Sequence, residues 1–491
     1  MKEFAEYLSF HPSAPYIAAL IYVAEIATAV SVIFLERKRP SATIAWVAVI
    51  FSLPIVGIIL YFLISQNIAR KKIYRLTEGE QKMMESSLHR QIEDIRQGRY
   101  RFRNPVEVKW SSLIQMNQQD DMAFLTQNNV VRLITDGVEM FDALLDQINS
   151  AQEYIHIEFF IIKNDNTGVR LMAALTKAAK RGVKVRLLVD AMGTRVTANS
   201  IVKEFAEAGG EVALFFPAFI KKVNLRFNYR NHRKLVVFDD RVAFVGGFNI
   251  GDEYLGKKKK FGFWRDTQLI IAGECVRDVN ARFILDWRFA SKENLSLNEA
   301  YYNFESRGGD SPIQVVSSGP DSDRQNIKHA YLKMISSASE KIYIQTPYFV
   351  PDGAIFDALV NAAYSGVDVR IMIPSIKDHV FVHWATLSYC GQLLSAGVKV
   401  YIYEGGFMHA KTIAVDGEVC SVGSANFDIR SFKLNFETNA IVYDSSVTAE
   451  MNALFEKDIR HSKELTEEEY EKRTPGVKFK ESLSRLVSDI L

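Results

Sequence analysis

The sequence has few cysteines, and its histidines form no pattern typical of a metal site. The three cysteines, Cys275, Cys390 and Cys420, are odd in number and widely spaced, which argues for reduced side chains and against a disulfide framework. No histidine falls at a metal-ligand spacing. We therefore expect a cytoplasmic catalytic region that uses no metal and no other cofactor.

The chain also lacks a large net charge of either sign. Lys and Arg together number 60 and Asp and Glu 58, so the formal net charge is +2, and 48% of the residues are hydrophobic. This composition excludes a disordered protein or a long polyanion-binding tail. Any functional basic surface must therefore be local. The 491 residues suffice for two to four domains with substantial cores.

Two long apolar runs lie near the amino terminus, at residues 15–35 and 44–64. Each run has the ~20 residues that a membrane-spanning helix needs. A cleaved signal peptide is the alternative, but Lys2, Glu3 and Glu6 do not make the basic start of such a peptide. The sequence thus predicts two transmembrane helices within residues 1–68 and a multi-pass membrane protein.

Basic residues flank the second apolar run on both sides, at residues 37–39 and 70–75. The positive-inside rule places both clusters in the cytoplasm, which a simple hairpin of two spans does not achieve. Pro54 and Gly57 lie inside the second run and permit a re-entrant or tilted segment. Glu25 interrupts the first run; it is either functional, or near an interface, or against a partner helix.

Strands and helices alternate after residue 105, and the pattern occurs twice. A polar, helix-prone connector, residues 69–104, precedes it. A strand, a helix and a strand are expected at Glu153–Phe160, Val169–Arg181 and Gly182–Asp190, and again at Lys341–Phe349, Ala354–Ser365 and Gly366–Pro374. This duplication predicts an α/β protein with two similar lobes, residues 105–298 and 312–460, and a tail, residues 461–491.

The same residue types recur at the same spacing in both halves. His, Lys, Asp and Asn occupy offsets 0, 2, 7 and 17 in the two motifs, which are His232, Lys234, Asp239 and Asn249, and His409, Lys411, Asp416 and Asn426. Because each motif begins as a strand, its His and Lys share one face. Small residues, Gly246-Gly247 and Gly423-Ser424, precede each Asn and allow a ligand to approach the backbone.

This set of residues suits a phosphodiester substrate. Two lysines can neutralise the non-bridging oxygens, while a neutral histidine attacks phosphorus and a protonated one releases the alcohol. Each histidine needs a partner for its second ring nitrogen, and Asp266 and Glu437, in comparable strands after each motif, are the candidates. The other histidines of the lobes are interpreted as scaffold residues: His156, His329, His379 and His383.

The duplicated His-x-Lys-x4-Asp-x6-Gly-[Gly/Ser]-x-Asn pattern resembles that of the phospholipase D superfamily. The whole chain, with its apolar amino terminus, both lobes, residues 316–320 and a carboxyl-terminal helix, is similar to the bacterial cardiolipin synthases of that superfamily. The resemblance implies two α/β/α sandwich lobes related by a pseudo-two-fold axis. It also implies a protein of the bacterial cytoplasmic membrane, with its catalytic lobes on the cytoplasmic side.

The resemblance further implies a phosphatidyltransferase that joins two phosphatidylglycerol molecules into cardiolipin and glycerol through a phosphatidyl-histidine. It acts at an anionic membrane, with no metal and no nucleic acid. His232 would be the nucleophile and His409 the acid and then the base, although these roles could be reversed. Lys234 and Lys411 would hold the phosphate, and the other residues would brace the site or bind substrate: Asp239, Asp416, Asn249, Asn426, Ser424, Asp266 and Glu437. A phospholipase D-type hydrolase, a phosphatidylserine synthase and a nucleic-acid phosphodiesterase stay open as alternatives.

Four segments combine apolar or aromatic residues with basic ones. Residues 215–230 and 257–264 suit an anionic membrane surface, single-stranded nucleic acid, or buried aromatics beside an exposed lysine run. Residues 381–384 could enter lipid. Near the carboxyl terminus an apolar helical stripe either lies in the membrane interface or packs on the lobes. That stripe comprises Leu483, Leu486, Val487, Ile490 and Leu491, with Lys478, Lys480 and Arg485 nearby.

Overall fold

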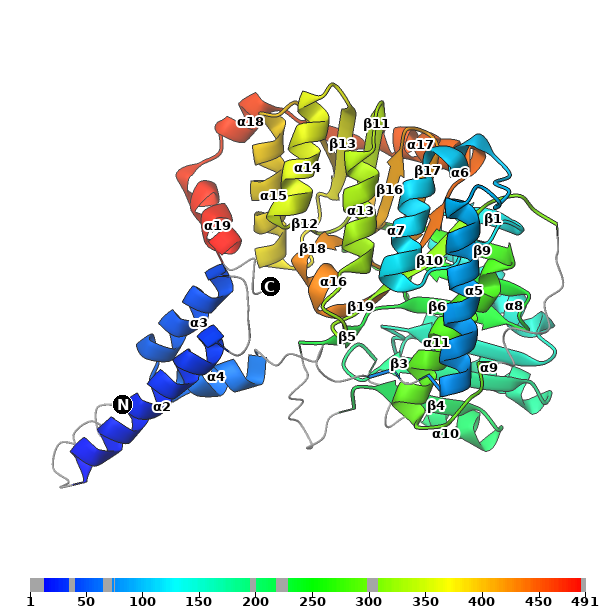
Figure 1. The fold of residues 1–491 in the computed structure, drawn as a ribbon, viewed down its shortest axis with the longest axis horizontal. Coiled ribbons are helices and arrows are strands. Elements are labelled where there is room, and N and C mark those ends of the chain that lie inside the picture. The colour runs from blue at the N-terminus through cyan, green and yellow to red at the C-terminus, as the bar shows by residue number, and fades with distance from the viewer. Residues whose placement is uncertain are drawn as a thin grey trace. The chain divides into compact units, whose positions relative to one another are not determined.

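The computed structural model describes residues 13–34, 40–64, 73–74, 76–194, 200–217, 228–297 and 308–486. The chain divides into an amino-terminal unit, residues 1–68 with 218–228, and a larger unit that contains the remaining residues (Figure 1).

The described part of the amino-terminal unit contains one long helix and two short ones. Within the described residues, α2 (Ala14–Phe34) is the one helix long and apolar enough to cross a membrane. The second apolar run forms α3 (Pro40–Ser52) and α4 (Val56–Ile64), which at 1.5 Å per residue are only about 20 and 14 Å long. The expectation of two transmembrane helices is therefore wrong for the second run.

The break between α3 and α4 has a local cause. Pro54 has no N–H to donate within a helix, and Ile55 adopts a left-handed conformation with φ of 66°, which an L-residue cannot propagate as a helix. Helix α4 then folds back on α3, where a Cβ at Gly57 would lie 2.5 Å from the Val49 carbonyl oxygen. Val32, Ile50 and Tyr61 form the buried core of this unit.

Glu25 lies on α2 and is buried. Its Oε1 has no hydrogen-bond partner among the described residues. This burial fits a position against a neighbouring helix of the amino-terminal unit, and the positions near a membrane interface or in a functional site stay predictions.

The larger unit begins with three helices, α5 (Glu78–Arg96), α6 (Pro105–Lys109) and α7 (Ser111–Asp121). A reciprocal cap fixes the start of α5: the Glu80 amide donates to Thr77 Oγ1 over 3.3 Å, and the Thr77 amide donates to Glu80 Oε2 over 2.8 Å. Ile95 of α5, together with Leu113 and Ile114 of α7, joins the core of the second lobe. The connector is thus packed against the lobes.

The first lobe contains a seven-stranded sheet in the order β1-β9-β7-β6-β2-β3-β4. Strands β2, β3 and β4 are parallel and the other neighbours antiparallel. Its elements are β1 (Asn129–Ile134), α8 (Gly137–Ser150), β2 (Tyr154–Phe159), α9 (Asn166–Lys180), β3 (Lys184–Asp190), α10 (Ser200–Glu207), β4 (Glu211–Phe215), β5 (Arg230–Asn231), β6 (Lys234–Phe238), β7 (Val242–Gly246), β8 (Phe263–Arg265), β9 (Gln268–Gly273) and α11 (Cys275–Ser291).

The second lobe repeats this order as β10-β19-β17-β16-β11-β13-β14 and adds β20 at the edge. The predicted α/β class and the duplication into two lobes are confirmed. Its elements are β10 (Ile313–Ser318), α13 (Asn326–Ser336), β11 (Lys341–Gln345), β12 (Phe349–Val350), α14 (Gly353–Tyr364), β13 (Asp368–Pro374), α15 (Val380–Leu394), β14 (Lys399–Tyr403), β15 (Gly406–Met408), β16 (Thr412–Val415), β17 (Val419–Gly423), β18 (Phe427–Asp428), α16 (Ile429–Lys433), β19 (Asn435–Val442), α17 (Ser445–Ile459), β20 (Ser462–Leu465), α18 (Glu467–Glu471) and α19 (Pro475–Leu486).

Alternate residues of each strand enter different cores. In β6, Val236 and Phe238 contribute to a core with α8 and α9, whereas Leu235 and Val237 face the other way. That second face shares one core with the corresponding face of the second sheet, including Val422 of β17, and with α11 and α17. The two lobes are therefore joined through an apolar layer between their sheets.

Candidate active site

The two lobes exchange short strands immediately before their histidines. Strand β5 of the first lobe pairs in parallel with β19 of the second, and β15 of the second lobe pairs with β8 of the first. The His232 amide donates to the Phe436 carbonyl over 2.9 Å, and the His409 amide donates to the Arg265 carbonyl over 2.7 Å. Each histidine is thus held by the backbone of the opposite lobe.

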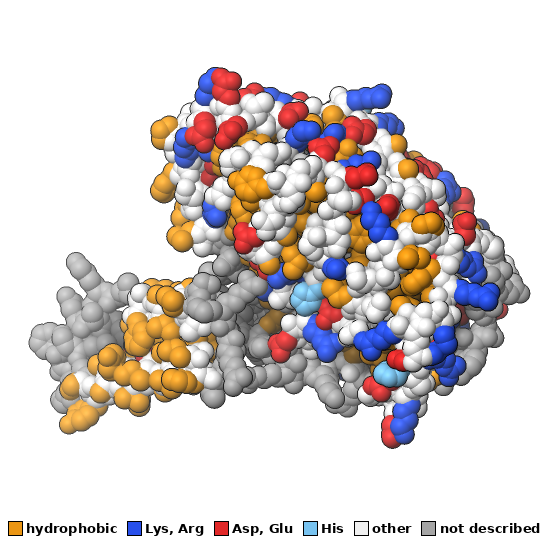
Figure 2. All heavy atoms as spheres, turned by 45° about the horizontal axis from the view of Figure 1, so that its top comes forward, with side chains coloured by type: hydrophobic (Ala, Val, Ile, Leu, Met, Phe, Trp, Pro, Cys, Tyr) orange, Lys and Arg blue, Asp and Glu red, His pale blue; other side chains and the backbone are white. Residues whose placement is uncertain are grey.

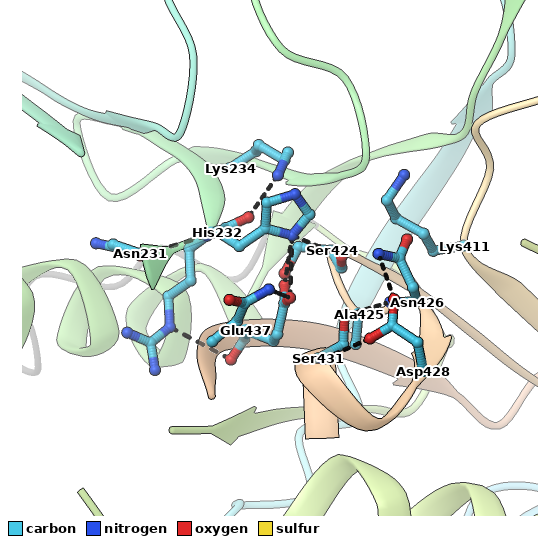
Figure 3. A network of polar contacts seen from close by, with 12 residues as sticks. Asn231, His232, Lys234, Lys411, Ser424, Ala425, Asn426, Asp428, Ser431 and Glu437 are labelled. Carbon is cyan, nitrogen blue, oxygen red and sulfur yellow. Dashed lines mark hydrogen bonds and ion pairs between the residues drawn. The ribbon is translucent and has the colours of Figure 1, made fainter. Parts of the chain in front are cut away.

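The side chains of the histidines are also paired across the lobes. His232 Nδ1 lies 3.0 Å from both carboxylate oxygens of Glu437 and 3.2 Å from the Ser424 carbonyl oxygen (Figure 3). His409 Nδ1 lies 2.5 Å from Asp266 Oδ2. Ionised carboxylates and carbonyls only accept hydrogen bonds, so each Nδ1 carries the proton and each Nε2 keeps its lone pair.

The two lysines fold back over their own histidines. Lys234 Nζ donates to the His232 carbonyl over 2.5 Å. Lys411 Nζ donates to the His409 carbonyl and lies 2.9 Å from His409 Nδ1. Both lysines are buried, and Lys411 lies on the same side of His232 as Asn426 (Figure 3). The predicted sharing of one strand face by His and Lys therefore brings their polar groups together in both lobes.

Burial lowers the pKa values of all four groups, and repulsion by neighbouring cations lowers those of His232, Lys234 and His409 further. Burial lowers the pKa of Lys234 to about 7, and burial together with Lys411 lowers the pKa of His409 to about 4. The pKa of His232 is lowered by burial and, less strongly, by Lys234 and Lys411. Each motif thus acts on the other, so both belong to one electrostatic environment. Such a site favours an anionic ligand, which would offset the repulsion between its cations.

The two orienting carboxylates stay ionised despite their burial. Burial acts to raise the pKa of Asp266, but Lys411 and His409 hold it below its ordinary value. Burial likewise acts to raise the pKa of Glu437, and His232 and Lys234 hold it low. Two imidazoles with available Nε2 atoms, two ammonium groups and two fixed carboxylates can supply a nucleophile, a proton carrier and phosphate ligands.

The aspartates of the motifs do not contact the histidines. Asp239 accepts hydrogen bonds of 2.7 to 2.8 Å from three backbone amides, at residues 152–154 at the start of β2. Asp416 accepts from the amides of residues 339–341, at the start of β11. Both aspartates have positive φ values, 51° and 54°, as the first residue of a tight turn between the motif strands. They brace the strand ends.

The remaining predicted site residues lie between the motif strands and their neighbours. Asn249 Oδ1 accepts from the Ile161 amide over 3.2 Å. Asn426 Nδ2 donates to Asp428 over 3.2 Å, while its buried Oδ1 has no partner among the described residues. The Thr438 amide donates to Ser424 Oγ over 3.0 Å. Asn426 therefore retains an acceptor, whereas Ser424 is used by the scaffold.

A buried ion-pair network next to His232 was not predicted from the sequence. The Arg233 guanidinium lies 2.9 and 3.0 Å from the carboxylate oxygens of Asp286 on α11, and it donates to Thr438 Oγ1 over 2.9 Å. The Tyr74 hydroxyl, from the connector, donates to Asp286 over 2.5 Å. The sequence contains one signal for this network, which is the position of Arg233 inside the motif. No residue spacing indicates that Asp286 or Tyr74 belongs to it.

The other histidines have scaffold contacts. His156 is buried, with Nδ1 2.8 Å from Asn280 Oδ1, and burial lowers its pKa to about 3. His329 Nδ1 lies 2.6 Å from Asp120, and His379 is exposed. Across the described ranges, no group of three or more His, Cys, Asp or Glu side chains is placed to hold a metal ion.

The aromatic and basic residues around the first motif separate into two groups. Phe215, Phe216 and Trp264 are buried, and the Trp264 ring lies 5.0 Å from that of His409. Lys257 to Lys260 are exposed. Phe215, Phe216 and Trp264 therefore fit buried aromatics beside an exposed lysine run, whereas Phe263 is 40% exposed next to that run. Residues 218–227 lie outside the described part of the chain.

Comparison with known proteins identifies related sequences over nearly the whole chain. The family model "Cardiolipin synthase, PLD-like domain" matches residues 144–287 and 331–459, and the model "Phospholipase_D-nuclease N-terminal" matches residues 26–66. A cardiolipin synthase of Oceanobacillus iheyensis is 46% identical over 473 residues, which are 96% of this chain and 98% of that protein. The major cardiolipin synthase of Bacillus subtilis is 46% identical over 475 residues, with the same two coverages.

Among solved structures, a phosphatidylserine synthase of Haemophilus influenzae has a similar fold. It superposes with a TM-score of 0.60 at 16% sequence identity and covers 77% of this chain and 100% of that chain. At this identity the likeness concerns the fold only.

Proposed function

The chain belongs to the cardiolipin synthase family of the phospholipase D superfamily, and on this premise we propose that it condenses two phosphatidylglycerol molecules into cardiolipin and glycerol. The enzyme is a phosphatidyltransferase. The observation that carries the reaction is the pair of His-Lys motifs, whose histidines have orienting carboxylates in opposite lobes. This arrangement supports a two-step transfer, since it provides one imidazole for attack and another for proton transfer.

In the first step, His232 Nε2 attacks the phosphorus of the donor phosphatidylglycerol. The bond between phosphorus and the headgroup glycerol oxygen breaks, and His409 gives that oxygen a proton, so that glycerol leaves and a phosphatidyl-histidine remains. The anionic phosphodiester, held by Lys234 and Lys411, raises the affinity of His409 for the proton that it donates. Glu437 stabilises the positive charge that develops on His232.

In the second step, the headgroup hydroxyl of another phosphatidylglycerol replaces the histidine. His409, now neutral, takes the proton of that hydroxyl as the oxygen attacks phosphorus. The bond between phosphorus and His232 Nε2 breaks, which gives cardiolipin, frees the neutral His232 and leaves His409 protonated, ready for the next cycle. Asn426 Oδ1, which has no partner among the described residues, is available to accept a hydrogen bond from the incoming hydroxyl group.

The experiment uses the purified full chain with phosphatidylglycerol and identifies the lipid products by mass. Cardiolipin and glycerol are expected, whereas phosphatidic acid as the main product would replace the proposal with a hydrolase. His232→Ala and His409→Ala should each lower the rate of cardiolipin formation at least about 10³-fold. His89→Ala, at an exposed residue of α5, is the control and should leave the rate unchanged. Near-normal activity of either active-site variant would contradict the assignment.

We also propose that the protein is attached to the cytoplasmic membrane with its lobes on the cytoplasmic side. If α2 crosses the bilayer and α3 with α4 forms a re-entrant segment, the basic residues 37–39 and 70–75 face the same side, as the positive-inside rule favours. The short lengths of α3 and α4 support this arrangement. The side chain introduced by Lys38→Cys should then react with a membrane-impermeant thiol reagent in inside-out vesicles and not in right-side-out ones. The opposite result would reverse the proposed topology.

A further inference from the structure

Helix α19 packs on the second lobe with its polar side and turns its apolar side outward. Glu481 and Ser484 are buried against the protein, whereas Phe479, Leu483 and Leu486 are 67%, 44% and 79% exposed. The exposed residues are spaced by four and three positions and therefore form one stripe. A helix that serves only to cover its own protein has the reverse arrangement. The outward stripe therefore requires a partner outside the lobes.

The start of α15 continues this stripe. Val380 and Phe381 are exposed there, and α15 packs along α19, since Lys480 Nζ lies 5.5 Å from the centre of the Trp384 ring. We define the α15–α19 face by its five exposed apolar residues, Val380, Phe381, Phe479, Leu483 and Leu486. Figure 2 shows apolar side chains at the margin of the larger unit where α19 lies, with both basic and acidic side chains beside them.

Cations predominate among the charged residues of the α15–α19 face, although Lys478 Nζ lies 3.4 Å from a carboxylate oxygen of the exposed Glu471. Lys478, Lys480 and Arg485 are the exposed charged residues of α19, and its single acidic residue, Glu481, is buried and paired with Arg473 over 2.8 Å. Lys377 lies over the Trp384 ring at 4.1 Å. An apolar stripe bordered by cations matches the surface of a bilayer that contains anionic lipids.

A polar cavity lies between α15, α18 (Glu467–Glu471) and α19, next to the α15–α19 face. It has a volume of about 630 Å³ and is lined by residues that include Tyr389, Arg473, Lys478, Glu481 and Arg485. Glu481 Oε1 is buried and has no hydrogen-bond partner among the described residues. Cations that can bind a phosphate and a carboxylate oxygen that can accept from a hydroxyl group suit the headgroup of an anionic phospholipid.

We propose that the α15–α19 face lies on the surface of an anionic bilayer, with its apolar stripe among the outer acyl segments and a lipid headgroup in the cavity. Residues 65–73 join α4 to Tyr74, whose hydroxyl is bonded to Asp286 of the larger unit. Fully extended, this segment reaches roughly 30 Å, so the chain itself keeps the lobes near the membrane. The α15–α19 face provides a second attachment, which does not depend on the reaction.

The test places a fluorophore on the full chain in vesicles of phosphatidylglycerol and phosphatidylcholine. Cys275, Cys390 and Cys420 are all buried, so Leu483→Cys can be labelled selectively. The matched control is Val138→Cys on α8, where the native side chain is 46% exposed, close to Leu483. With quenchers on the acyl chains, the probe at 483 should lose at least about half of its fluorescence, and the probe at 138 should lose little. Conversion of phosphatidylglycerol to cardiolipin keeps the lipid charge constant.

The charge requirement is tested on the same vesicles after flotation, which selects the protein that is bound through α2. Quenching at 483 should disappear in pure phosphatidylcholine, in about 1 M salt, and in Lys480→Glu with Arg485→Glu, but persist in Lys480→Arg with Arg485→Lys. His232→Ala should dock normally, which separates this proposal from the proposed reaction.

Equal quenching at 483 and 138 would overturn the proposal. Absence of quenching with disulfide formation between two Leu483→Cys chains would also overturn it and would assign the face to a second copy.

Discussion

The two lobes have the same sheet order and the same motif, but they differ at the turn that precedes the motif asparagine. In the first lobe a Cβ at Gly247 would lie 2.0 Å from Asp266 Oδ1, so no side chain fits there. In the second lobe Ser424 occupies the equivalent position beside the longer Glu437, and its carbonyl accepts from His232. The comparison shows that each small residue is matched to the carboxylate beside it, so the lobes are similar without being interchangeable.

The largest difference expected between the lobes concerns the leaving group. With phosphatidyl-p-nitrophenol, whose phenolate leaves without a proton, His409→Ala should release p-nitrophenol in the first turnover within about tenfold of the unmodified rate, because the acid is not needed. His232→Ala should remain at least about 10³-fold slower, because the nucleophile is missing. Stopped-flow absorbance measures both. The reverse order would exchange the roles of the two histidines.

The crosswise pairing of carboxylates and histidines can be tested on the same substrate. Asp266→Asn and Glu437→Gln should each lower the rate of cardiolipin formation by about 10²-fold or more, because each neutral amide orients its histidine poorly. In the His409→Ala background with phosphatidyl-p-nitrophenol, Asp266→Asn should have little further effect, whereas Glu437→Gln should retain its full effect. The opposite coupling would show that each carboxylate serves the histidine of its own lobe.

Exchange of the small residues should affect the lobes unequally. Gly247→Ser should lower the free energy of unfolding by about 2 to 3 kcal/mol, because the added Cβ displaces Asp266. Ser424→Gly should cost only about 1 kcal/mol, for the lost hydrogen bond of Ser424 Oγ. Thermal unfolding in detergent measures both changes, and Gly247→Ser should also lose activity. Equal effects of the two substitutions would contradict the fit of Gly247 to Asp266.

The smallest effect is expected at Asp416. Burial acts to raise its pKa, but the amides of Glu340 and Lys341 lower it below its ordinary value. A carboxyl group with a lowered folded-state pKa stabilises the protein above its unfolded pKa and loses that contribution as the pH falls through the folded value. Asp416→Asn should therefore destabilise by about 1 to 2 kcal/mol at pH 7, and the difference should shrink below about pH 4. Unfolding temperatures at the two pH values provide the measurement; a difference that grows in acid would contradict this account.

The lobes were predictable because their strands and helices have clear periodicity and the pattern occurs twice. The predicted strand at residues 153–160, for example, contains β2, Tyr154–Phe159. The pairing of Asp266 with His409 was not predictable, because two equivalent carboxylates and two equivalent histidines can be joined in two ways. Only the exchange of β5 and β15 between the lobes decides between them.

Local backbone geometry explains the incorrect second span. A hydropathy profile sums the apolar residues of 44–64, and it contains no information on the left-handed backbone conformation of Ile55. Periodicity likewise predicted an apolar stripe on the carboxyl-terminal helix, of which Leu483 and Leu486 are described, while Val487, Ile490 and Leu491 lie outside the described residues. It does not reveal which side of that helix is buried. The burial of Glu481 and Ser484 depends on the surface of α15 and α18, which the helix sequence does not contain.

The strand exchange has a consequence during synthesis of the protein. When the ribosome has completed the first lobe, His232 has neither the β19 backbone nor the Glu437 carboxylate, since both are translated later. Lobes generally fold as units in the order in which they emerge, so a nascent or truncated chain already inserted in a bilayer has no oriented nucleophile. Lipid chemistry therefore begins only after residue 437 has left the ribosome, and unfinished chains do not consume the membrane that holds them.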